Sequence, residues 1–315
     1  MEEKNIPSAP LFCDPICDGA ADPTIIWNRQ EKAWWIIYTQ RRANVECEGY
    51  SWVHGSDIGI ASSNDDGKSW TYRGILQGLE FEKGRNTFWA PEVIWENGLY
   101  HMYVSYVRGV PQDWAAQASI VHFTSGNLWD WKYESILNLE CKEVIDACVH
   151  KLPDGKWRMW YRNDLNTYAA DSDNLYNWKV AGPVITDCHH EGPNVFFWKE
   201  KYWMITDPWE GMAVYYSTDC QNWTRQSNIL ETPGKRSGDS NQGSHGDVLV
   251  IGEKAYLFYH VHPEHYRDDS KSMFYSMPYS SKRSVLQVVE LEYESGQLVC
   301  DRNKPFKLSL FENND

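Results

Sequence analysis

The chain has 315 residues, of which 42% are hydrophobic and 15% aromatic, so it can bury a sizeable core. Its net charge of −14 repels phosphate backbones and anionic membrane surfaces, which argues against nucleic acids and membranes as partners. No run approaches the ~18 apolar residues that a membrane span requires. A neutral partner such as a sugar fits this charge better, and the aromatic content suits both strands and sugar-binding walls.

The N-terminal sequence MEEKNIPSAP lacks the basic and apolar regions of a secretory signal, so we expect a cytoplasmic protein. Eight cysteines are scattered along the chain, and no CxxC pair indicates a structural zinc site. In a cytoplasmic protein such cysteines are reduced thiols.

Taken in chain order, five segments share one layout. Each has a polar or acidic head, an apolar strand, a short turn and a second strand rich in aromatic residues, which is typical of a β-hairpin. The five segments are ADPTIIWNRQEKAWWIIYT (21–39), APEVIWENGLYHMYVSY (90–106), IDACVHKLPDGKWRMWYR (145–162), HEGPNVFFWKEKYWMIT (190–206) and SHGDVLVIGEKAYLFYH (244–260).

A second pattern follows the first four segments: a strand, a turn of Asp, Asn or Gly, and then Trp70, Trp131, Trp178 or Trp223. The separations of 45 to 61 residues are near the ~40–50 residues of one four-stranded propeller blade. The repeat predicts an all-β, five-bladed β-propeller that spans 1–315 as a single domain, with 234–246 as a rim loop. A two-sheet sandwich also has many short strands, but it gives no reason to repeat a head group.

The heads of the five segments carry ionisable residues. Aligning the segments by their first strands places Asp22, Glu92, Asp146, Glu191 and His245 near one position. In a propeller the innermost strand of each blade lines the central channel, so these heads are predicted to converge on one axis. Converging carboxylates repel one another, which raises at least one pKa and provides a protonated acid beside an ionised base. Glycoside hydrolysis needs that pair.

The head motifs resemble those of glycoside hydrolase family 43. ADPTII is similar to its catalytic-base motif, FWAPEV to its WAP(D/E) motif, VIDACV to its pKa-tuning motif, HEGPNVFFWKEKYW to its general-acid motif and GSHGDV to its axial-histidine motif. The resemblance covers roughly residues 15–295, in the family's order. TQRRAN, HGSDIGIASS, TFWAPEV, LPDGKWRMWYR and HHEGP are closer to family 117, the neoagaro-oligosaccharide hydrolases. Both families imply a five-bladed fold and inversion at the anomeric carbon.

The resemblance implies a role for each head residue. Asp22 would be the general base, Asp146 would tune the acid and hold the sugar, and Glu191 would be the proton donor. Under the family 117 likeness His190 would be the acid instead, since an imidazole titrates near neutrality. His245 resembles the axial histidine that sits over a water-ringed, calcium-like ion, which would be structural; the chemistry itself requires no cofactor.

Further residues are candidates for sugar contact, namely Glu92, Trp89, Arg162 and Trp209, with blade packing as the alternative for the tryptophans. We expect exo-action on a short oligosaccharide with a terminal sugar resembling an arabinofuranoside, a xyloside or 3,6-anhydro-L-galactose. Closure of one side of the channel by the loops 40–56 and 108–118 would favour exo-action. A homodimer is left open.

Three alternatives remain beside this interpretation. His260, His262 and His265 could form a transition-metal site, or simply end a strand in a rim loop. SNDDGKSW (63–70) fits the Asp-box turn of sialidases, but no arginine stands at an equivalent blade head to bind a carboxylate. The chain could also be a non-catalytic, sugar-binding propeller, although such a module has no need of three acids on one axis.

Overall fold

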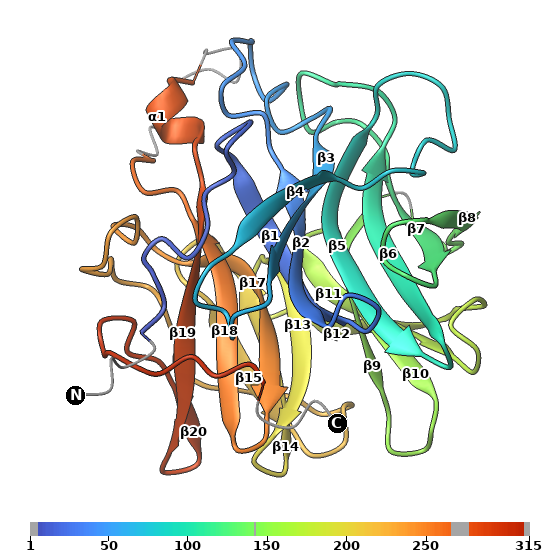
Figure 1. The fold of residues 1–315 in the computed structure, drawn as a ribbon. Coiled ribbons are helices and arrows are strands. Elements are labelled where there is room, and N and C mark those ends of the chain that lie inside the picture. Colours follow the sequence, from blue (N-terminus) through green and yellow to red (C-terminus); the bar gives the residue numbers. More distant parts are fainter. Residues whose placement is uncertain (1–5, 142, 266–276, 312–315) are drawn as a thin grey trace.

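A computed structural model describes residues 6–141, 143–265 and 277–311 of the chain. Within these ranges the structure is nearly all β, with α1 (Tyr279–Lys282) as its one short helix. Five antiparallel sheets of four strands stand around a common axis (Figure 1). The predicted five-bladed β-propeller is confirmed, and the sandwich alternative is excluded.

Each blade takes four consecutive strands, in chain order from the axis outward. The strands are β1 (Ala20–Asn28), β2 (Ala33–Gln40), β3 (Asp57–Ser63) and β4 (Thr71–Ile75); β5 (Thr87–Glu96), β6 (Leu99–Val107), β7 (Ala118–Ser125) and β8 (Lys132–Ile136); β9 (Val144–Lys151), β10 (Trp157–Asn163), β11 (Asn166–Ser172) and β12 (Lys179–Ile185); β13 (Glu191–Trp198), β14 (Lys201–Asp207), β15 (Ala213–Ser217) and β16 (Thr224–Arg225); and β17 (Ser244–Ile251), β18 (Lys254–Val261), β19 (Val285–Glu294) and β20 (Gln297–Val299).

The second strand of each blade is buried on both faces because neighbouring blades pack against it. In β2, for example, all eight residues of AWWIIYTQ are buried. Trp35, Trp160 and Trp203 occupy equivalent second strands and are fully buried between blades. The outer strands β4 and β8 instead expose much of their length to solvent. The aromatic second strands of the sequence repeat are therefore core elements.

The turn after the third strand has the same hydrogen bonds in four blades. A serine that ends the strand bonds to an Asp or Asn two residues later, as Ser63 does to Asp65 at 2.8 Å. The same pairing joins Ser125 to Asn127, Ser172 to Asn174 and Ser217 to Asp219. The Asp-box sequence at 63–70 is one copy of this structural turn, which explains the regular tryptophan that follows it.

The ring of blades is closed between β17 and β1, which contact each other as the other neighbouring inner strands do. Both ends of the described chain support this closure. Leu286 on β19 exchanges backbone hydrogen bonds with Phe12, and Trp34 Nε1 in β2 donates to the carbonyl oxygen of Leu310 at 2.8 Å. The predicted rim loop 234–246 runs from blade 4 to the beginning of blade 5.

Candidate active site

Every inner strand has a β-bulge near its beginning, where its pairing with the second strand is interrupted. A bulge leaves residues unpaired and redirects their side chains. The bulges place Asp22, Ala90, Asp146, Gly192 and His245 at equivalent positions of the five blades. The first four have left-handed φ values between +43° and +59°. These residues form a head layer around the axis.

The predicted alignment was therefore wrong at two positions. Glu92 lies two residues beyond the bulge residue of its strand, whereas Glu191 lies one residue before it. Gly192 takes the equivalent place in blade 4, and a Cβ there would lie 2.6 Å from the ring of His245. The head layer thus contains two carboxylates, Asp22 and Asp146, and Glu191 reaches it from the preceding residue.

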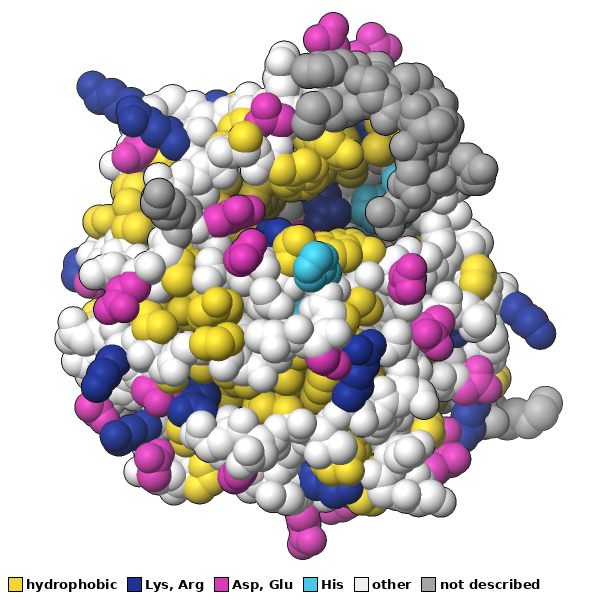
Figure 2. Space-filling model, turned by 180° about the vertical axis from the view of Figure 1, so that it is seen from behind, with side chains coloured by type: hydrophobic (Ala, Val, Ile, Leu, Met, Phe, Trp, Pro, Cys, Tyr) yellow, Lys and Arg dark blue, Asp and Glu magenta, His cyan; other side chains and the backbone are white. Residues whose placement is uncertain are grey.

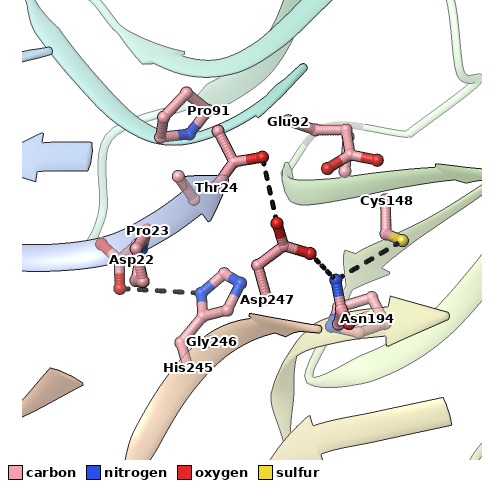
Figure 3. Close-up of a pocket in the computed structure, with 13 residues that line it drawn as sticks. Asp22, Pro23, Thr24, Pro91, Glu92, Cys148, Asn194, His245, Gly246 and Asp247 are labelled. Atoms are coloured by element: carbon pink, nitrogen blue, oxygen red, sulfur yellow. Dashed lines mark hydrogen bonds and ion pairs between the residues drawn. The ribbon is translucent and has the colours of Figure 1, made fainter. Parts of the chain in front are cut away.

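A second layer lies deeper in the channel, two residues beyond each bulge residue. Its members are Thr24, Glu92, Cys148, Asn194 and Asp247 (Figure 3). Four of them accept a backbone N–H from the inner strand of the next blade: Glu92 from Val149 (2.7 Å), Cys148 from Val195 (3.1 Å), Asn194 from Val248 (3.1 Å) and Asp247 from Ile25 (2.9 Å). The axial edge of an inner strand has no strand partner, so these side chains satisfy its N–H groups and join the blades.

Asp22 is buried and held as an ion. Arg41 Nη2 lies 3.0 Å from both carboxylate oxygens, and His245 Nδ1 lies 3.6 Å from Oδ1. Burial alone would raise the pKa of Asp22, but Arg41, the two histidines His260 and His245 and a hydrogen bond from Thr39 together hold that pKa well below its ordinary value, with Arg41 the largest of these contributions. His260 also faces Asp22, yet burial lowers its own pKa to about 3, so Arg41 supplies the positive charge at neutral pH.

Asp146 and Glu191 are shifted in the opposite direction. Burial, together with the charge of Asp22, raises the pKa of Asp146 to about 7. Burial and the neighbouring Asp146 raise the pKa of Glu191 to about 7 as well. Arg162 moderates both shifts, and its Nε is buried without a hydrogen-bond partner among the described residues. The site thus combines one ionised carboxylate with two carboxyls that are partly protonated at neutral pH.

Trp209 and Asp207 complete the surroundings of Glu191. The indole Nε1 of Trp209 donates to Glu191 Oε1 at 3.2 Å, so this predicted sugar contact touches the carboxyl directly. Asp207 is the residue opposite Glu191 in the β13–β14 pairing, and it was not singled out from the sequence. Arg41 was missed too, because its distance from Asp22 along the chain shows no regular spacing.

His190 faces away from these carboxyls. Its side chain is fully buried, its Nε2 lies 2.7 Å from Thr167 Oγ1, and its Nδ1 lies 2.8 Å from the carbonyl oxygen of Cys188. Burial lowers the pKa of His190, which disfavours the charged form that an acid needs. Both ring nitrogens are therefore occupied by partners outside the head layer.

Trp89 belongs to an aromatic rim beside the site. Its Nε1 donates to the carbonyl oxygen of Val53 at 2.6 Å, and its ring centroid lies 5.0 Å from that of His54 and 6.0 Å from that of Trp114. The rim is built by 41–56 and 108–117, which connect the second and third strands of blades 1 and 2. Figure 2 shows a hollow in the upper part of the molecule, where acidic, basic and histidine side chains gather among hydrophobic ones.

His260 near the end of β18, and His262 and His265 after it, are not grouped as metal ligands. His262 and His265 direct Nδ1 to the backbone carbonyls of Arg283 and Ser281, and His262 Nε2 lies 3.2 Å from Arg41 Nη1. In the part of the chain that the structure describes, no three His, Cys, Asp or Glu side chains could hold a metal ion together. Among the described residues no such cluster includes His245, and the water-ringed, calcium-like ion expected beside it stays a prediction. The described helix is also too short to cross a membrane.

The burial of Glu92 predicts how stability depends on pH. Burial and the nearby Asp247 raise the pKa of Glu92 to about 8, from an ordinary value of 4.5. Between these values the folded protein holds a proton that the unfolded chain has lost, so stability falls as pH rises. Glu92→Gln mimics the protonated acid. We expect its melting temperature to exceed that of the wild type by about 2 °C or more at pH 9 and to match it near pH 5.

Calorimetry at both pH values checks this, with the exposed Glu294→Gln as a control that should leave the pH dependence unchanged. Equal losses of melting temperature in Glu92→Gln and the wild type between pH 5 and 9 would show that Glu92 is ionised in the folded protein.

The fold is that of the family 43 propellers. A thermostable family 43 glycoside hydrolase superposes with a TM-score of 0.67 at 18% identity, over 94% of this chain and 97% of its own. A β-xylosidase gives 0.65 at 16% identity, over 96% and 98%. An exo-1,5-α-L-arabinanase from a bovine ruminal metagenomic library gives 0.61 at 15% identity, over 92% and 99%. No family model and no curated protein matches the sequence.

Proposed function

We propose that this protein is an inverting glycoside hydrolase acting on a short oligosaccharide. The observation that carries the proposal is that three buried carboxyls at the blade heads have pKa values shifted in opposite directions. Asp22 is held ionised by Arg41, whereas burial and mutual repulsion raise the pKa values of Asp146 and Glu191 to about 7. An ionised base beside a protonated acid is what glycoside hydrolysis with inversion requires.

In the proposed mechanism Glu191 donates a proton to the leaving oxygen while Asp22 accepts one from the attacking water. Arg41 engages both oxygens of Asp22, but each carboxylate oxygen has a second lone pair that can accept the water's hydrogen bond. Burial and the charge of Asp146 keep the pKa of Glu191 high. Glu191 is preferred to His190 because the nitrogens of His190 bond to Thr167 and Cys188.

For the substrate we propose a group of terminal sugars and not a single one. Structural neighbours include a β-xylosidase and an exo-arabinanase, so a terminal xylose-like or arabinofuranose-like sugar fits the fold. The likeness to family 117 adds 3,6-anhydro-L-galactose to the candidates. The structural calcium-like ion, a homodimer and a cytoplasmic location remain predictions, and no step of the mechanism depends on them.

The loops above the site favour action at a chain end. Residues 41–56 and 108–117 build long connections in blades 1 and 2, whereas two residues, Asp164 and Leu165, join the equivalent strands of blade 3. The long loops of blades 1 and 2 form a wall on one side of the site, so a terminal sugar can bind at the carboxyls. The remaining sugars of the substrate can extend over the short connection of blade 3 or along the aromatic rim.

Trp114 marks this rim as a contact for the second sugar. Its side chain is 51% exposed although its ring lies 4.9 Å from that of Tyr50, centroid to centroid. Stacking on an aromatic ring contributes about 0.5–1.5 kcal/mol, so Trp114→Ala should raise KM for oligosaccharides about two- to thirteenfold. Aryl monoglycosides, which lack a second sugar, should be hydrolysed as before. Tyr176→Ala, an exposed aromatic residue in the turn between the third and fourth strands of blade 3, is the control. Equal effects of Trp114→Ala on both substrate types would refute the assignment.

The proposed function is tested with a panel of aryl glycosides and of agar, arabinan and xylan oligosaccharides. NMR of the first sugar released should show the anomer opposite to that of the substrate. Retention of configuration would contradict the assigned base. Binding of an oligosaccharide without turnover would support the sugar-binding propeller instead.

A further inference from the structure

Asp207 is a fourth buried carboxyl at the blade heads, and the proposed mechanism does not use it. It ends β14, directly opposite Glu191, and its side chain is 2% exposed. No lysine or arginine of the described ranges lies within ion-pair distance of it. Burial and the charge of Glu191 raise the pKa of Asp207 to about 7. A carboxyl in such a place costs stability unless its hydrogen bonds repay that cost.

The hydrogen bonds of Asp207 reach two different parts of the site. Its Oδ1 accepts the backbone N–H of Trp209 at 2.7 Å, and its Oδ2 accepts the backbone N–H of His245 at 2.9 Å. Trp209 has a left-handed φ of +60°, an unfavourable conformation for a tryptophan, so a bond to its N–H helps to hold the turn. The bond to His245 joins blade 4 to the head of blade 5.

Each of these two neighbours touches one of the reacting carboxyls. The indole of Trp209 donates to Glu191 Oε1 at 3.2 Å, and the ring of His245 lies 3.6 Å from Asp22 Oδ1. Two links, or arms, therefore run from Asp207. One passes through Trp209 to the acid Glu191, and the other passes through His245 to the base Asp22. Asp207 makes no hydrogen bond to either reacting carboxyl, so its hydrogen bonds act on them by orienting these neighbours.

We propose that Asp207 is a positioning residue that fixes the acid and the base relative to each other, a role that rests on the proposed hydrolase function. A displacement of about 1 Å in a reacting group can reduce the rate about 10²-fold. Loss of the arm to Glu191 impairs protonation of the leaving group, so it slows substrates with poor leaving groups most. Loss of the arm to Asp22 impairs activation of water and slows all substrates alike.

The experiment is a double-mutant cycle between Asp207→Ala and Trp209→Phe, measured as kcat with a poor and with an activated leaving group. Alone, Asp207→Ala should reduce kcat about 10²-fold on the poor leaving group and about tenfold on the activated one. In the Trp209→Phe background the indole bond is already absent. There, Asp207→Ala should reduce kcat about tenfold on both substrates.

Asp14→Asn is the matched control, because Asp14 is also 2% exposed and also accepts two backbone N–H groups, from Ile16 and Cys17, but has no hydrogen bond to Trp209 or His245. It should lower the melting temperature without any dependence on the leaving group. Asp207→Asn preserves the side-chain volume and is used if Asp207→Ala does not fold. It replaces one oxygen by an N–H donor and must therefore lose at least one arm.

Two results would overturn the inference: full kcat in a folded Asp207 variant, or the same leaving-group dependence with and without the indole of Trp209. Failure of the proposed function is distinguishable, since the wild type would then hydrolyse none of the glycosides, whereas failure of the acid assignment alone would leave Glu191→Gln fully active on the poor leaving group.

Discussion

Replacing Glu191 by Gln is expected to reduce kcat on substrates with poor leaving groups about 10²- to 10⁴-fold, the usual contribution of general acid catalysis. Glycosides with activated leaving groups need no proton and should be hydrolysed at nearly the wild-type rate. The expectation follows from the position of Glu191, where burial and Asp146 raise its pKa to about 7. The measurement is kcat and kcat/KM over a series of aryl glycosides that differ in leaving-group pKa.

The pH dependence provides a second readout of the same substitution. The acid must be protonated, so wild-type activity on poor leaving groups should fall as pH rises through about 7, and Glu191→Gln should lack this decline. Because Asp146 titrates in the same range, the decline reports the pair of carboxyls together.

His190→Gln is the matched control for the acid assignment. The side chain of His190 bonds to Thr167 and Cys188, so its replacement should change stability but not the leaving-group dependence. A leaving-group-dependent loss in His190→Gln, together with an unaffected Glu191→Gln, would transfer the role of acid to the histidine.

Replacing Asp22 by Asn is the second change with a large expected effect. The loss of kcat should again be about 10²- to 10⁴-fold, but it should be the same for poor and activated leaving groups, because both need the attacking water. The substitution also leaves Arg41 without its carboxylate in a buried site, so a lower melting temperature is expected. Activity and melting temperature are therefore measured on the same preparation, and a folded, fully active Asp22→Asn protein would exclude Asp22 as the base.

Arg41→Met keeps the Asp22 carboxyl but removes the positive charge that pairs with it. Burial would raise the pKa of Asp22, and Arg41 is the largest of the contributions that lower it. The ion pair with Arg41 therefore stabilises the fold above the ordinary pKa of 3.8, and this stabilisation is lost as pH falls. Without Arg41, burial should raise the pKa of Asp22, and activity should decline at a higher pH on the acidic side. An unchanged acidic limb would show that Arg41 does not set the ionisation of Asp22.

Some features of the fold follow directly from local sequence. The hairpin heads, the aromatic second strands and the turns before Trp70, Trp131, Trp178 and Trp223 each depend on residues that are neighbours in the chain. Their repeat along the chain was enough to predict five blades, because a single blade cannot bury its own apolar faces. The placement of Asp22, Asp146 and His245 at one level of the channel also followed from this repeat.

The positions of Glu92 and Glu191 could not be obtained in the same way. An alignment of strand beginnings assumes an even register, whereas each inner strand has a bulge, and a shift of one residue moves a side chain to the other face or another depth. For the same reason the sequence did not predict the deeper layer that joins the blades, which includes Cys148 and Asn194.

By itself, the sequence determined the propeller and the presence of acidic residues at its axis, since both depend on patterns that repeat along the chain. Only the tertiary structure decided which charges those acids meet. Arg41 beside Asp22, and Asp207 between Trp209 and His245, are contacts between segments with no common spacing. A carboxyl's pKa depends on burial and on charges within a few ångströms, and these distances exist only once the blades have closed into a ring.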